Sequence, residues 1–248
     1  MARYSPLRLR VFDSCRLRYR YQYVDKVTAR LRPSDTAGTL VHRVLCDFYS
    51  KVPVAGRTEE RLIELFESGW AALSQRYLRL DGADMLRQAS LTQLKNFVLH
   101  HVLTAEPFAV ETYLQAEVAP GVTLFGRMDR IDEEPDGTLH IIDYKTGEPP
   151  AEIDARQIRL YAIMVERELA RTVSKASFWY LDDGTTWTEG LDDSVKRLAL
   201  QDMLTAVEEM QRTSDSTPSI GTHCAHCPYL YACEVRDVVA RRRAAEGW

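Results

Sequence analysis

The pattern of apolar and polar residues changes from helical to strand-like near residue 109. Before that point, apolar residues recur at every third or fourth position in the segment 39–52, which follows Gly38. This spacing places them on one face of a helix. The same spacing predicts two further helices, near 58–78 and 86–104.

Strands are predicted from residue 109 onward. Runs of alternating or β-branched apolar residues occupy 109–118, 122–132 and 138–146. Pro-Gly and Asp-Gly turn dipeptides separate these runs, so they are predicted to form an antiparallel meander. A helix near 151–170, a strand near 174–181 and a helix near 192–212 follow. This order of elements predicts a mixed α/β fold.

Composition and charge narrow the class of protein. The 248 residues are 45% hydrophobic, which is enough for one domain with a sizeable core. The net charge of −4 argues against bulk electrostatic affinity for nucleic acid, although it allows a local basic groove. The sequence has neither the apolar stretch of a secretory signal nor an apolar run long enough for a membrane span. We therefore expect a cytoplasmic protein that does not enter a membrane.

Two acidic residues and a lysine carry the strongest chemical signal. Asp129 lies in GRMDRID, and Asp143 and Lys145 lie in IIDYKTG on the next predicted strand. Alternate strand residues share a face, so the three side chains can converge across the paired strands. Two neighbouring carboxylates need a cation to stay ionised, and Mg²⁺ or Mn²⁺ fits oxygen ligands. The D-x-K pattern is short, and an exposed Asp–Lys pair on an edge strand is its alternative interpretation.

With these residues in place, the chain resembles the RecB-type branch of the PD-(D/E)XK nuclease superfamily. That branch includes the nuclease domains of RecB and AddB and the CRISPR-associated adaptation nucleases. Its ordered motifs are matched by Gly38 and His42 in GTLVH, Asp129 in GRMD, Asp143 and Lys145 in DYK, and Gln157 and Tyr161 in QIRLY. The resemblance runs from about residue 5 to 235, and it departs from the family in lacking a proline before the aspartate of GRMD.

The resemblance implies a set of site residues. The implied metal ligands are His42, Asp129, Asp143 and Tyr144, and the implied catalytic residues are Asp129, Asp143, Lys145, Gln157 and Tyr161. Taken alone, a histidine on an apolar helix face is more often a core residue, and the resemblance favours a ligand. Gln157 and Tyr161 share one helix face, and core packing is the alternative role for Tyr161. Glu117 is an outer-shell candidate.

The resemblance also implies an architecture. We expect a restriction-endonuclease-like core, in which a small mixed sheet is flanked by helices, within a single nuclease domain spanning 1–248. A helical insertion is expected at about 52–105, and a cysteine-rich C-terminal segment at 221–235.

Four cysteines are predicted to form a second metal centre. Cys224, Cys227 and Cys233 form a C-x2-C-x5-C pattern, and Cys15 lies far upstream. Four thiolates suit either tetrahedral zinc or an iron–sulfur cluster, and ligand counting leaves both open. The AddB-type and CRISPR-associated relatives imply a [4Fe–4S] cluster that staples the two ends of the chain. Cys46, on a predicted helix, is interpreted as a buried free thiol.

Arginines cluster near both ends of the chain, at Arg8, Arg10, Arg16, Arg18 and Arg20, and at Arg236, Arg241, Arg242 and Arg243. They could line a channel for phosphates, with Tyr19, Tyr21 or Tyr23 stacking on bases. A solvated basic face is the alternative. We expect a metal-dependent DNA exonuclease that acts on single strands or ends in repair or recombination. The alternatives are a DNA-binding subunit that works with a helicase partner and a zinc-stapled structural protein.

Overall fold

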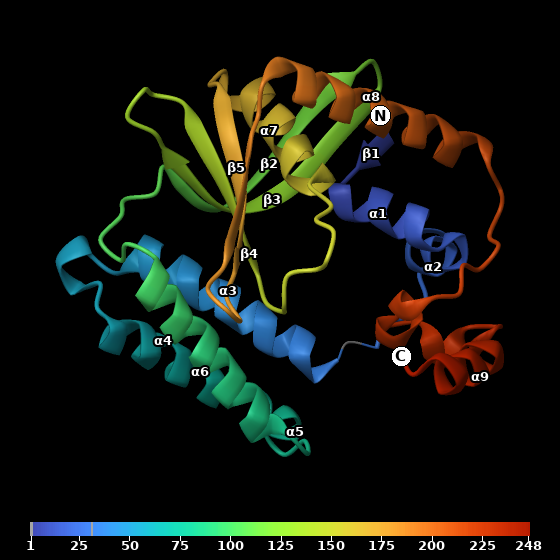
Figure 1. Ribbon diagram of the computed structural model, residues 1–248, viewed down its shortest axis with the longest axis horizontal. Coiled ribbons are helices and arrows are strands. Elements are labelled where there is room, and N and C mark those ends of the chain that lie inside the picture. The colour runs from blue at the N-terminus through green and yellow to red at the C-terminus, as the bar shows by residue number, and fades with distance from the viewer. Residues whose placement is uncertain (1, 31) are drawn as a thin grey trace. The chain divides into compact units, whose positions relative to one another are not determined.

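The computed structural model describes residues 2–30 and 32–248 (Figure 1). The chain folds into two compact units. Unit 1 contains the segments Met1–Arg3 and Pro33–Leu200, and unit 2 contains Tyr4–Arg32 and Gln201–Trp248. In the described part of the chain, no helix is long and apolar enough to cross a membrane.

A six-stranded sheet forms the centre of unit 1. Its strands are β1 (Ala2–Tyr4), β2 (Ala109–Ala119), β3 (Val122–Glu133), β4 (Leu139–Lys145), β5 (Val173–Tyr180) and β6 (Thr186–Gly190). The order is β1-β3-β4-β5-β6, with β2 paired to β3. The antiparallel pairing of β2 with β3 and of β3 with β4 confirms the predicted meander. The parallel pairing of β4 with β5 makes the sheet mixed, and α7 (Arg156–Leu169) supplies the crossover that parallel strands require.

Helices cover both faces of the sheet, so β4 is buried on both sides. Ile142 and Tyr144 face a hydrophobic cluster that includes residues of α3 (Pro33–Lys51), α4 (Glu59–Ala71) and α6 (Ala83–His100). Residues between them face the other way, where α7 packs against the sheet. The predicted layer of helices around a small mixed sheet is therefore confirmed.

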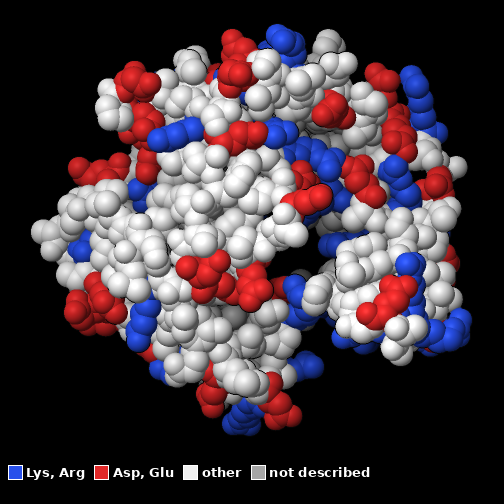
Figure 2. Space-filling view, in the orientation of Figure 1, with Lys and Arg blue, Asp and Glu red and all other residues white. Residues whose placement is uncertain are grey.

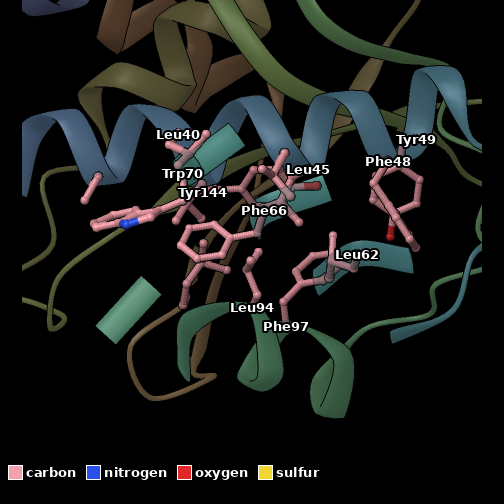
Figure 3. Close-up of a cluster of buried hydrophobic side chains, with 14 of the residues drawn as sticks. Leu40, Leu45, Phe48, Tyr49, Leu62, Phe66, Trp70, Leu94, Phe97 and Tyr144 are labelled. Carbon is pink, nitrogen blue, oxygen red and sulfur yellow. The ribbon is translucent and has the colours of Figure 1, made fainter. Parts of the chain in front are cut away.

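Helices α3, α4 and α6 share a core of large apolar side chains. Figure 3 shows this core, in which Phe48, Phe66 and Phe97 are completely buried. Burial of each such side chain contributes about 1.5–3 kcal/mol. Tyr144 reaches the same cluster from β4, so these helices are anchored to the strand that carries the D-x-K motif.

Two helix boundaries differ from the sequence expectation. The helix predicted at 58–78 is split into α4 and α5 (Gln75–Leu78), because Ser74 caps a new helix by accepting a hydrogen bond from the Tyr77 N–H. Helix α3 begins at Pro33, before Gly38 rather than after it. Gly38 therefore lies inside the helix. A Cβ at this position would lie 2.8 Å from Oγ1 of Thr146. This glycine therefore lets α3 approach the segment that follows the D-x-K motif.

Unit 2 brings the two ends of the chain together with short elements. It contains α1 (Pro6–Ser14), α2 (Arg16–Tyr19), the π-helical turn Arg20–Val24, residues 201–212 of α8 (Asp193–Arg212), two 3₁₀ turns (Thr222–His226 and Leu230–Ala232) and α9 (Arg236–Glu246). Backbone N–H of Arg30 donates to Pro228 O at 2.9 Å, and Tyr231 Oη donates to Thr28 O at 2.6 Å.

Two exposed elements were not predicted from sequence. In α9 only Val239 is buried, so its sequence has no apolar stripe. In β6 no residue is buried, and the strand pairs only with β5. Hydrophobic periodicity arises from burial of one face, and neither element has a face buried enough to produce it.

Candidate metal and catalytic site

The two predicted acids lie where the ladder between β3 and β4 opens. Arg130 pairs with Ile142, and the next residues outward are Asp129 and Asp143. Instead of continuing the ladder, the Asp129 carboxylate Oδ2 accepts a hydrogen bond from the Tyr144 N–H at 2.8 Å. The two acids are neighbours, because the charge of Asp129 is among those that raise the pKa of the Asp143 carboxyl.

Asp143 is buried and paired with Lys145. Asp143 is 5% exposed, and burial raises the pKa of its carboxyl. The ammonium of Lys145 lowers that pKa from 2.6 Å away, while the nearby charge of Asp129 raises it further. The Lys145 side chain keeps 29% of its surface exposed, so its ammonium group lies between a buried acid and solvent.

A glutamine on α7 joins the acid and the lysine. Gln157 Oε1 accepts a hydrogen bond from Lys145 Nζ at 2.9 Å, and Gln157 Nε2 donates to Asp143 Oδ1 at 2.8 Å. The same amide nitrogen donates to Tyr161 Oη at 3.2 Å. A side-chain amide has one accepting and one donating end, so these partners determine which way it faces.

Tyr161 reaches this position because residue 126 has no side chain. A Cβ on Gly126 would lie 2.5 Å from Cε1 of the Tyr161 ring. The glycine that begins GRMD therefore makes room for the tyrosine that ends QIRLY. The structure thus brings Asp143, Lys145, Gln157 and Tyr161 into one connected group of side chains.

His42 approaches the site from α3. Its Nδ1 lies 3.1 Å from Oδ1 of Asp129. Burial alone would lower the pKa of His42, but the hydrogen bond and charge of Asp129 raise it above the ordinary value. Asp129 is thus held by His42 through one oxygen and by the Tyr144 N–H through the other.

Glu111, on β2, completes a group that the sequence did not predict. One donor atom from each of His42, Glu111 and Asp129 lies within 4.8 Å of the other two. A histidine nitrogen with two carboxylate oxygens is a donor set that suits Mn²⁺ and, through its oxygens, Mg²⁺. Glu117, the acid predicted near the site, is exposed and instead accepts a hydrogen bond from the Gly121 N–H at 2.9 Å.

Tyr144 points away from the acids. Its ring is 3% exposed and packs near Phe97 and Trp179, with ring centroids 5.8 Å away in both cases. Burial raises the pKa of its hydroxyl far above the usual value. The side chain is therefore on the wrong face to hold a metal beside Asp129, and only the Tyr144 backbone carbonyl remains as a ligand.

Comparison with known proteins places this geometry in a family. The sequence profile of the PD-(D/E)XK nuclease superfamily matches residues 3–234, which is nearly the whole chain. The chain belongs to the PD-(D/E)XK nuclease superfamily. Membership implies divalent-metal-dependent cleavage of phosphodiester bonds, and the His42, Glu111 and Asp129 donors fit such an ion. No curated protein matches the sequence.

One solved structure supports the fold of this superfamily member. The crystal structure of a "Putative exonuclease" from Eubacterium rectale matches with a TM-score of 0.54 and 10% identity, over 90% of this chain and 86% of that one. At this identity the match shows the fold alone. The crystal structure of SSO0001 matches with a TM-score of 0.37 and 18% identity, over 80% of this chain and 96% of that one, and carries no fold argument.

The four predicted cysteine ligands of the nuclease line one cavity in unit 2. Cys15, Cys224, Cys227 and Cys233 surround it together with Tyr21, His223 and Tyr229. All four are free thiols. Burial raises the pKa of Cys227 and of Cys233, and the nearby Cys15 and Cys224 raise both further. Cys46 lies on α3 in unit 1, where burial raises the pKa of its thiol.

Proposed function

We propose that this nuclease is a DNA exonuclease of the RecB and AddB branch that acts on single-stranded DNA or DNA ends in repair or recombination. The observation that carries the proposal is the Asp143–Lys145 pair, with Asp129 beside it, at the opening of two paired strands. Superfamily membership supports phosphodiester cleavage as the reaction. The choice of DNA, of exonuclease action and of this branch rests on the motif resemblance.

The proposed ligands of Mg²⁺ or Mn²⁺ are the Asp129 and Asp143 carboxylates, His42 and the Tyr144 backbone carbonyl. Such an ion, when bound, polarises the scissile phosphoryl oxygen and offsets charge on the leaving oxygen. Lys145 holds the attacking water by a hydrogen bond from its ammonium, and its charge stabilises the developing negative charge on the phosphoryl group. Its position between Asp143 and solvent allows both roles.

Gln157 holds the side chains of Lys145 and Asp143 in a fixed position relative to each other. Its amide bonds both side chains at 2.9 and 2.8 Å, so neither can rotate without breaking a hydrogen bond. Tyr161 fixes the amide in turn. We assign these two residues to orienting the lysine and the acid, a more limited role than direct contact with DNA.

Unit 2 contains a candidate surface for DNA. The Arg8 guanidinium lies 5.5 and 5.1 Å from the ring centroids of Tyr19 and Tyr23, and those two rings are 5.2 Å apart. Arginine–tyrosine groups of this kind contact phosphates and stack on bases. Tyr21 is unsuited to this role, because it is 8% exposed and donates to Ala232 O.

The arginines of α9 add a second basic segment. Arg236, Arg241, Arg242 and Arg243 are exposed. On the face drawn in Figure 2, basic side chains lie over α9 with acidic side chains among them. The mixture of charges agrees with the net charge of −4, and it favours local phosphate contacts over general affinity for polyanions.

The cysteine cavity is the proposed site of a [4Fe–4S] cluster, with zinc as the alternative. Four sulfurs from both ends of the chain meet there, which supports a staple. His223 lies beside them, but its Nε2 is bonded to Ser219 O at 3.0 Å, which favours an all-sulfur ligand set. A brown protein with broad visible absorbance after anaerobic purification supports the cluster. A colourless protein loaded with zinc contradicts it.

Digestion of end-labelled single- and double-stranded DNA with Mg²⁺ or Mn²⁺ tests the function. The wild-type protein is expected to release short products from ends. The rate of product release by Lys145→Ala is expected to be lower by about a hundredfold or more. Equal degradation by the two proteins would contradict the catalytic assignment. DNA binding without cleavage by either protein would favour the alternative of a DNA-binding subunit that needs a helicase partner.

A further inference from the structure

The backbone at Glu111 departs from the strand that contains it. The flanking pairs Val110–Arg130 and Thr112–Met128 put Glu111 at the position opposite Asp129. Its φ angle is +46°, in the left-handed region that residues with a side chain rarely adopt. Holding a glutamate there costs on the order of 1 kcal/mol, and such residues concentrate at functional sites. Glycine or asparagine would adopt this backbone more easily, so the backbone conformation itself does not account for a glutamate at this position.

The Glu111 carboxylate lies at the site. One of its oxygens falls within 4.8 Å of donor atoms on both His42 and Asp129. Its side chain is 21% exposed. Two acids are thus held close together at an energetic cost that a bound cation would offset.

An ion pair with Arg127 does not explain this arrangement. Arg127 Nη1 lies 3.4 Å from Glu111 Oε2, but the arginine side chain is 66% exposed. Exposed pairs of this kind contribute about 0–1 kcal/mol, which is no more than the cost of the left-handed backbone.

Asp143 is engaged differently from the other acids. Its Oδ2 meets the ammonium of Lys145 and its Oδ1 meets the Gln157 amide, whereas the oxygens of Asp129 meet His42 and the Tyr144 N–H. The side chains that converge without a lysine between them are His42, Glu111 and Asp129. The acids of the site are therefore divided between a group joined to the lysine and a group joined to the histidine.

We propose that Glu111 is a direct ligand of the divalent ion, and that His42, Glu111 and Asp129 form its principal protein binding group. The inference rests on the proposed function, because it concerns the same ion. It adds to the motif residues an acid that no motif contains. Glu111 sets the affinity for the ion, while Asp143 and Lys145 act mainly on the water and the phosphoryl group.

Manganese binding tests this proposal separately from cleavage. Free Mn²⁺ is titrated into the full-length protein and measured by its electron paramagnetic resonance signal. Glu111→Gln, which removes the charge and keeps the shape, is expected to weaken Mn²⁺ binding about 10- to 100-fold. Glu117→Gln, on the same strand but away from the site, serves as the matched control and is expected to bind like wild type.

Arg127→Ala distinguishes the ligand role from the ion-pair role. If Glu111 binds the ion, Arg127→Ala leaves Mn²⁺ affinity unchanged or increases it, because a competing cation is gone. Equal weakening by Arg127→Ala and Glu111→Gln would overturn the proposal, as would wild-type affinity in Glu111→Gln. Thermal unfolding in the presence of a chelator confirms that each variant is folded. A wild-type protein that binds Mn²⁺ through Glu111 but cuts no DNA would contradict the proposed function alone.

Discussion

The acidic site of unit 1 and the cysteine cavity of unit 2 are two candidate metal centres built in opposite ways. The acids and their partners stand on β2, β3, β4, α3 and α7, and protein hydrogen bonds already orient Asp129 and Asp143. The cysteines stand at helix ends and on 3₁₀ turns, and Cys224 Sγ lies 3.7 Å from Ser219 O. The first site is arranged by the fold, whereas we expect the second to be arranged by the metal centre that its sulfurs are proposed to bind.

The surrounding cores differ in the same direction. The cluster beside β4 joins helices α3, α4, α5 and α6 to the sheet, and many of its side chains are fully buried. The cluster around the cysteines has four buried residues, and Cys15 is one of them. A small core seldom holds a fold without a staple. We therefore expect unit 1 to fold without its ion, and unit 2 to depend on its metal centre.

Removal of the metal centre from unit 2 should have the largest effect. A structural site of this type contributes about 10–16 kcal/mol to folding when it is zinc, and a cluster is expected to act similarly. Oxidation or strong chelation should abolish amide-exchange protection in 4–30 and 213–248. Protection in β3, β4 and α7 should be retained. Loss of protection in both units together would contradict the comparison.

Acid should destabilise unit 1 through His140. Burial, followed by the charge of Lys175, lowers the pKa of His140 to about 4. Arg130 acts in the same direction, whereas Glu134 and Asp132 oppose it. Because the folded pKa is below the unfolded value of 6.5, the unfolded state binds the proton first. Stability should therefore be complete above about pH 6.5 and decrease by up to about 3 kcal/mol as the pH falls to about 4.

His140→Gln should reduce this pH dependence in urea unfolding between pH 7 and pH 4. Glutamine can still hydrogen-bond Ser177, the present partner of His140 Nε2 at 2.7 Å. Some dependence should remain, because burial also lowers the pKa of His101 to about 4. The control is His226→Gln, at an exposed position in unit 2. An unchanged slope in His140→Gln would show that this histidine is not buried as a neutral group.

Gln157→Ala should have a smaller effect, confined to catalysis. It removes hydrogen bonds to two charged side chains, which are worth about 1.5 kcal/mol or more each. Turnover is expected to fall about tenfold with little change in KM or Mn²⁺ affinity, because Lys145 loses its orientation and the His42 group does not. Gln88→Ala, exposed on α6, is the control. A change in KM alone would favour a DNA-contacting role for Gln157 instead.

The parts predicted from sequence are those that depend on short-range rules. Asp129, Asp143 and Lys145 could be placed near one another because strand alternation and one turn determine their spacing. Alternation also separates Tyr144 from the acids, although the motif resemblance had grouped it with them. Glu111 was not found this way, because its backbone has a left-handed φ angle that strand alternation does not predict.

Other differences follow from contacts that the spacing of apolar residues does not reveal. Gly38 and Gly126 are recognisable as motif positions, but only the structure shows that Thr146 and the Tyr161 ring require them. The break before α5 depends on a cap at Ser74 within a sequence whose apolar spacing continues through it. The pairing of β6 with β5 leaves little trace, because neither face of β6 is buried.

The central claim is that cleavage occurs at the acid–lysine group of unit 1. The most direct measurement is single-turnover cleavage of end-labelled single-stranded DNA with Mn²⁺, by wild type and by Asp143→Asn, after thermal unfolding has shown that both proteins are equally folded. The account predicts a loss of about a thousandfold in Asp143→Asn, equivalent to about 4 kcal/mol in the barrier. Cleavage by Asp143→Asn at the wild-type rate would contradict it.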